Sequence, residues 1–148
     1  MRLLVSACLL GACCRYDSGS KPCPEILALA DSHALIPVCP EQLGGLPTPR
    51  PPAEIQSDGR VVNNRGEDVT AAYEKGAAEA LRLCRLLRCD AAVLKARSPS
   101  CGCESVYDGS FTGALIPGRG VAAQCLLDAG VPVFSEENFE ESLPSWTR

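Results

Sequence analysis

The stretch LLVSACLLG, residues 3–11, is a short apolar run that ends on a cysteine and, three residues later, a glycine. Residues 3–7 have the continuous apolar character of a strand that is buried on both faces of a sheet. Three other runs share this character, at residues 34–38, 91–95 and 131–134. The sequence therefore predicts four buried strands.

Helical patterns lie between these runs. Apolar residues recur at helical spacing after Asp68, which is a suitable N-cap, and predict a helix to about Arg88. Shorter helices are expected over residues 22–30 and 121–129, with Gly130 as a left-handed cap. Ser135 is expected to cap a short terminal helix. The remaining long segments are expected to be loops without regular elements, at residues 40–54 and 107–120.

Strands that alternate with helices predict an α/β fold with a parallel sheet covered on both faces. We expect residues 1–148 to form one domain, a three-layer sandwich with a mostly parallel, Rossmann-like sheet of about four to five strands.

Cysteines stand at or just after the ends of three predicted strands. Cys8 and Cys39 follow their strands directly, and Cys101 follows residues 91–95 within a short turn. Because ligands of parallel sheets bind beyond the carboxyl ends of the strands, these three thiols are expected to meet at one edge. Thiolates suit an iron–sulfur cluster or zinc, and a site without metal is the remaining alternative.

The other seven cysteines divide into two groups. Cys84 and Cys125 fall on apolar helix faces and, together with Cys89, are interpreted as core residues. The residues of the second group could provide a fourth ligand, a zinc site or a resolving thiol, or they could be ordinary loop cysteines. They are Cys13, Cys14, Cys23 and Cys103.

Composition limits the classes of partner. The net charge of -4 and the scattered arginines argue against nucleic acid as a partner. No apolar run has the roughly 20 residues that span a bilayer, and the apolar stretch before Cys8 is too short for a signal peptide. We therefore expect a cytoplasmic protein, in which cysteines serve metal binding or catalysis more often than disulfides.

Three polar residues close to the cysteines could take part in chemistry. Glu41 lies two residues after Cys39 and would be a suitable general acid or base beside a metal group, although a lone loop glutamate is usually solvated. Ser98 and Ser100 could orient a ligand next to Cys101 or simply be turn residues.

Several motifs occur together in an order that resembles one known family. They are SACLLG at 6–11, RYD at 15–17, CPEQLGGL at 39–46, PRPPAEI at 49–55, GEDVT at 66–70, LKARSPSCG at 94–102 and YDGSF at 107–111. The chain resembles a short bacterial domain family typified by thiouracil desulfidase, and the resemblance covers nearly its whole length.

The resemblance implies an oxygen-sensitive 4Fe–4S cluster held by only Cys8, Cys39 and Cys101, with one open iron for the sulfur of a thiolated nucleobase. It also implies that Glu41 activates water or moves protons, and that a serine beside Cys101 positions water or substrate, Ser98 in preference to Ser100. The implied enzyme is a desulfidase that converts thiouracil hydrolytically into uracil and sulfide.

Other functions stay open at this point. A related enzyme could handle sulfide or thiolated RNA, and a zinc or iron–sulfur module without catalysis could serve redox sensing. A fourth cysteine ligand would remove the open iron and favour this last alternative. The oligomeric state does not follow from the sequence.

Overall fold

The computed structural model describes residues 1–142, and its centre is a four-stranded parallel sheet. The strand order is β2-β1-β5-β8. The bounds are Arg2–Ser6 for β1, Ala34–Val38 for β2, Ala91–Leu94 for β5 and Val133–Ser135 for β8. These strands match the four predicted runs to within two residues at each end, so the α/β fold with a parallel sheet is confirmed.

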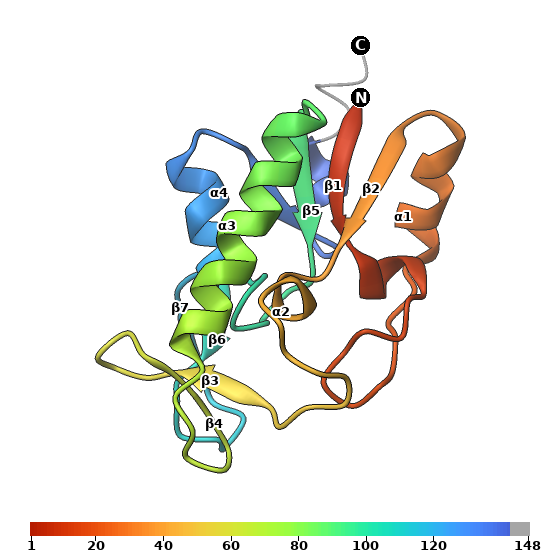
Figure 1. Cartoon of the computed structure of the whole chain (residues 1–148). Helices are drawn as coiled ribbons and strands as arrows, with labels where there is room; N and C mark the ends of the chain where they lie inside the picture. Colours follow the sequence, from red (N-terminus) through yellow and green to blue (C-terminus); the bar gives the residue numbers. More distant parts are fainter. Residues whose placement is uncertain (143–148) are drawn as a thin grey trace.

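Helices cover both faces of this sheet (Figure 1). They are α1 (Pro24–Leu27, continued by a 3-10 turn, Ala28–Asp31), α3 (Thr70–Leu86), α4 (Val121–Asp128) and α5 (Phe139–Ser142). Successive side chains of a strand point to opposite faces. Leu3 accordingly shares a buried cluster with Ile26 of α1, whereas Leu4 shares another with Ala80 of α3 and Leu126 of α4. The three-layer sandwich is confirmed.

The register aligns the carboxyl ends of three neighbouring strands. Ser6 of β1 pairs with Val38 of β2, and Val5 pairs with Val93 of β5. After β1 the chain enters a 3-10 turn, Ala7–Leu10, that contains Cys8 and ends at Gly11 with φ 98°. Glycine adopts this left-handed conformation without steric cost. In Figure 1 the arrowheads of β1, β2 and β5 point to the same end of the molecule.

The long helix α3 begins and ends close to the predicted positions. The carboxylate of Asp68 accepts a hydrogen bond from the backbone N–H of Thr70 at 2.9 Å, although the helix itself begins at Thr70, so that Val69 occupies the N-cap position. The helix ends at Leu86, two residues before the expected Arg88, which has a positive φ of 54°.

The two segments expected to lack regular elements do contain them, and this prediction was wrong. Residues 40–54 contain the helix α2 (Pro40–Leu43) and the start of β3 (Ala53–Ile55), which pairs with β4 (Val61–Asn63). Residues 105–117 form a second antiparallel pair, β6 (Ser105–Tyr107) and β7 (Leu115–Pro117). These elements have only three or four residues each, too few for a hydrophobic period to be visible in the sequence.

Two glycines bring α2 directly against α3. A Cβ on Gly76 would lie 1.8 Å from the carbonyl oxygen of Pro40, and one on Gly44 would lie 1.9 Å from the carbonyl oxygen of Ala72. Only glycine at both positions allows this backbone contact, which fixes α2 at the carboxyl end of the sheet.

Among residues 1–142, no helix is both long and apolar enough to cross a membrane.

Candidate functional site

A cavity of about 520 Å³ opens at the carboxyl ends of β1, β2 and β5. Its inner wall comes from the residues that follow these strands, and other parts come from the loop after Cys8 and from the β3–β4 and β6–β7 region. The residues that matter below are Cys8, Cys14, Tyr16, Cys39, Glu41, Arg50, Tyr73, Lys95, Ser98, Ser100, Cys101, Tyr107 and Phe111. The cavity therefore lies where the sequence placed the site.

Cys8, Cys39 and Cys101 line one part of this cavity, which we call the cysteine side. Cys8 and Cys101 are 7% and 5% exposed. Burial, together with the neighbouring Cys101 thiol, raises the pKa of Cys8 to about 12. Burial also raises the pKa of Cys101 to about 12, although hydrogen bonds from Ser100 and Ser6 oppose the shift. Both thiols thus keep their protons unless a cation compensates the thiolate charge.

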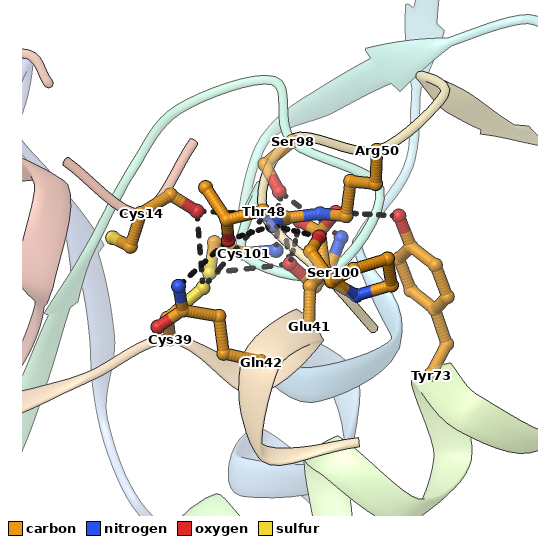
Figure 2. A network of polar contacts seen from close by, with 11 residues as sticks. Cys14, Cys39, Glu41, Gln42, Thr48, Arg50, Tyr73, Ser98, Ser100 and Cys101 are labelled. Atoms are coloured by element: carbon orange, nitrogen blue, oxygen red, sulfur yellow. Dashed lines mark hydrogen bonds and ion pairs between the residues drawn. The ribbon is translucent and has the colours of Figure 1, made fainter. Parts of the chain in front are cut away.

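A second part of the cavity, the carboxylate side, consists of Glu41, Arg50, Tyr73 and Ser100 (Figure 2). Glu41 lies in the first turn of α2, a helix that proline at its first position favours. Its carboxylate accepts hydrogen bonds from Arg50 Nε at 3.1 Å, Tyr73 Oη at 2.7 Å and Ser100 Oγ at 3.0 Å. The expectation that a lone loop glutamate is solvated is therefore wrong here.

Glu41 raises the pKa values of both Arg50 and Tyr73, two of its neighbours on the carboxylate side. Burial disfavours the charge of Arg50, but the Glu41 carboxylate outweighs this effect, and the pKa of Arg50 is raised. Burial, reinforced by Glu41, raises the pKa of Tyr73, which stays a neutral hydrogen-bond donor. The site thus presents a carboxylate with its counter-charge already in place.

The two serines before Cys101 have different places. Ser100 is 1% exposed, and its hydroxyl lies 3.0 Å from Glu41 Oε2 and 3.4 Å from Cys101 Sγ. Ser98 Oγ lies 3.0 Å from Ser100 Oγ and accepts the backbone N–H groups of Ser100 and Cys101, each at 3.1 Å. Ser100 therefore contacts Glu41 directly, while Ser98 shapes the turn behind it.

Of the four cysteines considered as further ligands, Cys14 lines the cavity. Burial and the neighbouring Cys39 raise its pKa to about 11. Cys13 is exposed, Cys23 is the N-cap of α1, and Cys103 packs against the cluster under α3 and α4. All ten cysteines fall within residues 1–142, and each is a free thiol there.

In the described part of the chain, no three Cys, His, Asp or Glu side chains are arranged so that they could hold a metal ion. The three thiols of the cysteine side do line the same cavity.

Two residues of this site, Arg50 and Tyr73, were not predicted to be functional. The Tyr73 ring is buried on the apolar face of α3, as helical spacing predicts, and that spacing gives no signal for its hydroxyl. Arg50 stands between prolines in TPRPP at 48–52, and an arginine held in such a rigid segment was a usable signal.

The chain is similar to known proteins over nearly its whole length. Residues 3–138 match the 2-thiouracil desulfurase family. The chain is 40% identical over 150 residues to the uncharacterized protein YbbK of Bacillus subtilis (strain 168), covering 95% of this chain and 99% of that one. It is also similar to the solved structure of the [4Fe-4S]-dependent thiouracil desulfidase TudS, with a TM-score of 0.92 and 42% identity over 99% of this chain and 97% of that one. The chain belongs to the 2-thiouracil desulfurase family.

Proposed function

We propose that this protein is an iron–sulfur-dependent desulfidase that removes sulfur hydrolytically from a thiolated nucleobase such as thiouracil, giving uracil and sulfide. The observation that carries the proposal is the cavity itself, in which three strand-end thiols, two of them buried, lie beside a carboxylate that accepts hydrogen bonds from Arg50, Tyr73 and Ser100. Family membership and the similarity to TudS support the same activity.

The donor set fits a 4Fe–4S cluster held by Cys8, Cys39 and Cys101. Thiolates are the usual ligands of such clusters. Burial makes free thiolates unfavourable at Cys8 and Cys101, and bound iron would supply the compensating positive charge. Three protein ligands would leave one iron open to substrate.

The reaction exchanges the sulfur of a C=S group for an oxygen from water. The cluster would supply a Lewis-acidic iron that polarises the carbon–sulfur bond. Glu41 Oε2 would take a proton from the attacking water, or pass one to a ring nitrogen of the substrate. The Ser100 hydroxyl, 3.0 Å from that oxygen, would orient the water. Water adds, sulfide leaves with the protons, and no electron donor is consumed.

The mouth of the cavity suits a planar heterocycle. Tyr16 and Phe111 line it and are 40% and 39% exposed, and Tyr107 adds a third aromatic ring. Such side chains can stack on a flat ring, which makes a small nucleobase a suitable substrate. We place the enzyme in the cytoplasm, where free thiols stay reduced.

Anaerobic reconstitution with iron and sulfide, followed by incubation with 4-thiouracil, tests this function. Cluster-dependent loss of the near-ultraviolet absorption of 4-thiouracil, with release of stoichiometric sulfide, is the expected result. A loaded protein that leaves 4-thiouracil intact would contradict the substrate, and bound zinc without visible absorption would favour the non-catalytic module.

A further inference from the structure

The guanidinium of Arg50 joins three separate segments inside the protein. The side chain is 4% exposed. Its Nε donates to Glu41 Oε1 at 3.1 Å, and Nη1 donates to Pro47 O at 3.2 Å and to Thr48 Oγ1 at 3.0 Å. Nη2 donates to Cys14 O at 2.9 Å and lies 3.9 Å from Cys39 Sγ. All three guanidinium nitrogens therefore have partners, and one arginine touches both the carboxylate side and the cysteine side.

The two oxygens of Glu41 have different surroundings as a result. Oε1 accepts from both Arg50 Nε and Tyr73 Oη, at 3.1 and 2.7 Å. Oε2 accepts from Ser100 Oγ at 3.0 Å. A carboxylate held by two donors on one oxygen cannot rotate freely. Oε2 thus keeps a fixed direction, toward Ser100 and Cys101.

The second contact of Arg50 concerns Cys39. Hydrogen bonds to ligand sulfurs are among the factors that set the reduction potential of an iron–sulfur cluster. Lys95 also lines the cavity, but its ammonium lies 3.7 Å from the carboxylate of Glu136, so its charge is partly compensated there. Arg50 hydrogen-bonds both a predicted cluster ligand and the proposed proton acceptor.

We propose that Arg50 is the positioning residue of this reaction: it fixes Glu41 so that Oε2 faces the reaction space, and it donates a hydrogen bond to the Cys39 sulfur that raises the cluster's potential. This inference rests on the proposed function. Arg50 itself moves no proton. It acts through Glu41 and Cys39.

A lysine cannot take over both tasks. A guanidinium presents five donors in a rigid plane, whereas an ammonium is a compact charge on a flexible stem. Lysine at this position could keep the charge beside Glu41 but could not also span to Cys14 O, Thr48 and Cys39 Sγ. Arg50→Lys therefore keeps the positive charge beside Glu41 but removes the hydrogen bonds that position it, so the two contributions can be told apart.

The test compares Arg50→Lys with Arg60→Lys in the cluster-loaded protein. Arg60 is a matched control, because its Nε also pairs with a carboxylate, Asp58 at 2.8 Å, but on the surface, where the two side chains are 57% and 54% exposed. Three quantities are measured for each variant: cluster content per chain, kcat and KM for 4-thiouracil, and the midpoint potential of the cluster without substrate.

For Arg50→Lys we expect normal cluster content, a kcat lower by about 100-fold with little change in KM, and a more negative midpoint potential. Arg60→Lys should match the wild type in all three quantities. An Arg50→Lys enzyme with wild-type kcat and wild-type potential would overturn the proposal. So would a loss of activity that only follows a loss of cluster.

Tyr73→Phe keeps the proposal testable if Arg50→Lys does not fold. It removes the other donor to Oε1 and should lower kcat while it leaves the midpoint potential unchanged, since Tyr73 makes no contact with Cys39 among the hydrogen bonds of the described chain. An unchanged kcat in this variant would argue against a fixed Oε2. If the loaded wild type turns over no thiouracil, the proposed function fails, and the potentials together with crystal structures of the Glu41–Ser100 contact still decide the role of Arg50.

Discussion

The cysteine side and the carboxylate side of the cavity are built in different ways. The three thiols follow strands of one sheet, so backbone hydrogen bonds between β2, β1 and β5 determine where they lie. The four residues of the carboxylate side come from α2, a proline-rich segment, α3 and the turn after β5, and side-chain hydrogen bonds hold them together. The first side is a consequence of the fold, whereas the second depends on individual side chains. The proposed roles follow this division. The cysteine side would hold the cluster, and the carboxylate side would position water and transfer protons.

Cys101→Ser should have the largest effect, because it removes a thiol that the sheet places in the wall of the cavity. We expect no stable cluster after anaerobic reconstitution and activity below detection. Iron and sulfide content and the visible absorption measure this. Cys125→Ser, on α4 and away from the cavity, is the control and should load normally. A fully loaded Cys101→Ser protein would show that the cysteine side does not hold the cluster.

Glu41→Gln should have the next largest effect, because it should impair the carboxylate side while leaving the cysteine side intact. The amide keeps the shape of the carboxylate but cannot accept a proton, so kcat should fall by about 100-fold or more while cluster content stays normal. Anaerobic turnover of 4-thiouracil, normalised to bound iron, measures it. Glu79→Gln, which changes a carboxylate on the outer face of α3 paired with Arg82, should behave like the wild type. Undiminished turnover in Glu41→Gln would rule out the role of Glu41.

Gly76→Ala should affect the carboxylate side through the backbone. The new Cβ would meet the carbonyl of Pro40, so α2 must shift and carry Glu41 with it. Such overpacking costs about 1–3 kcal/mol of unfolding free energy, and misplacing Glu41 should lower kcat by about tenfold. Chemical denaturation and turnover assays measure the two effects. Lys75→Ala, at an exposed neighbouring position of α3, should show neither. Equal kcat values in the two variants would mean that α2 tolerates the shift.

Cys14→Ser should have the smallest effect. The backbone carbonyl of residue 14, which accepts Arg50 Nη2, remains in this variant. If three cysteines hold the cluster, both cluster content and turnover should equal those of Cys13→Ser, whose side chain is exposed. Loss of the cluster, or a change in its electron paramagnetic resonance signal, would identify Cys14 as a fourth ligand and contradict an open iron.

The sequence was sufficient for the sheet and for the placement of the three thiols. The expected strand at residues 91–95 coincides with β5 to within one residue, because all of β5 is buried and a buried strand of a parallel sheet is a continuous apolar run. The run at residues 34–38 coincides with β2, but its predicted burial was wrong, since β2 is an edge strand and only Val38 is buried. Cys8, Cys39 and Cys101 could then be placed at one edge by topology alone. Glu41 was found through its nearness to Cys39 in the chain.

The partners of Glu41 could not be found in the same way. Ser100 and Tyr73 are 59 and 32 residues from Glu41 in the sequence, and only the packing of α2 against α3 and the turn after β5 brings them together. The strand β7 was missed for a different reason. All three of its residues are exposed, so it has no buried face whose alternation could reveal it.

In two places the chain joins a predicted cluster ligand to a proton-handling residue almost directly. Only Pro40 separates Cys39 from Glu41, and Ser100 is bonded to Cys101. The number of covalent bonds between each of these cysteines and its neighbouring polar residue is therefore fixed by the chain. The arrangement of the outer loops does not change it. Tyr16 and Phe111, which line the same cavity, lie elsewhere in the sequence, so replacing them would leave that spacing unchanged.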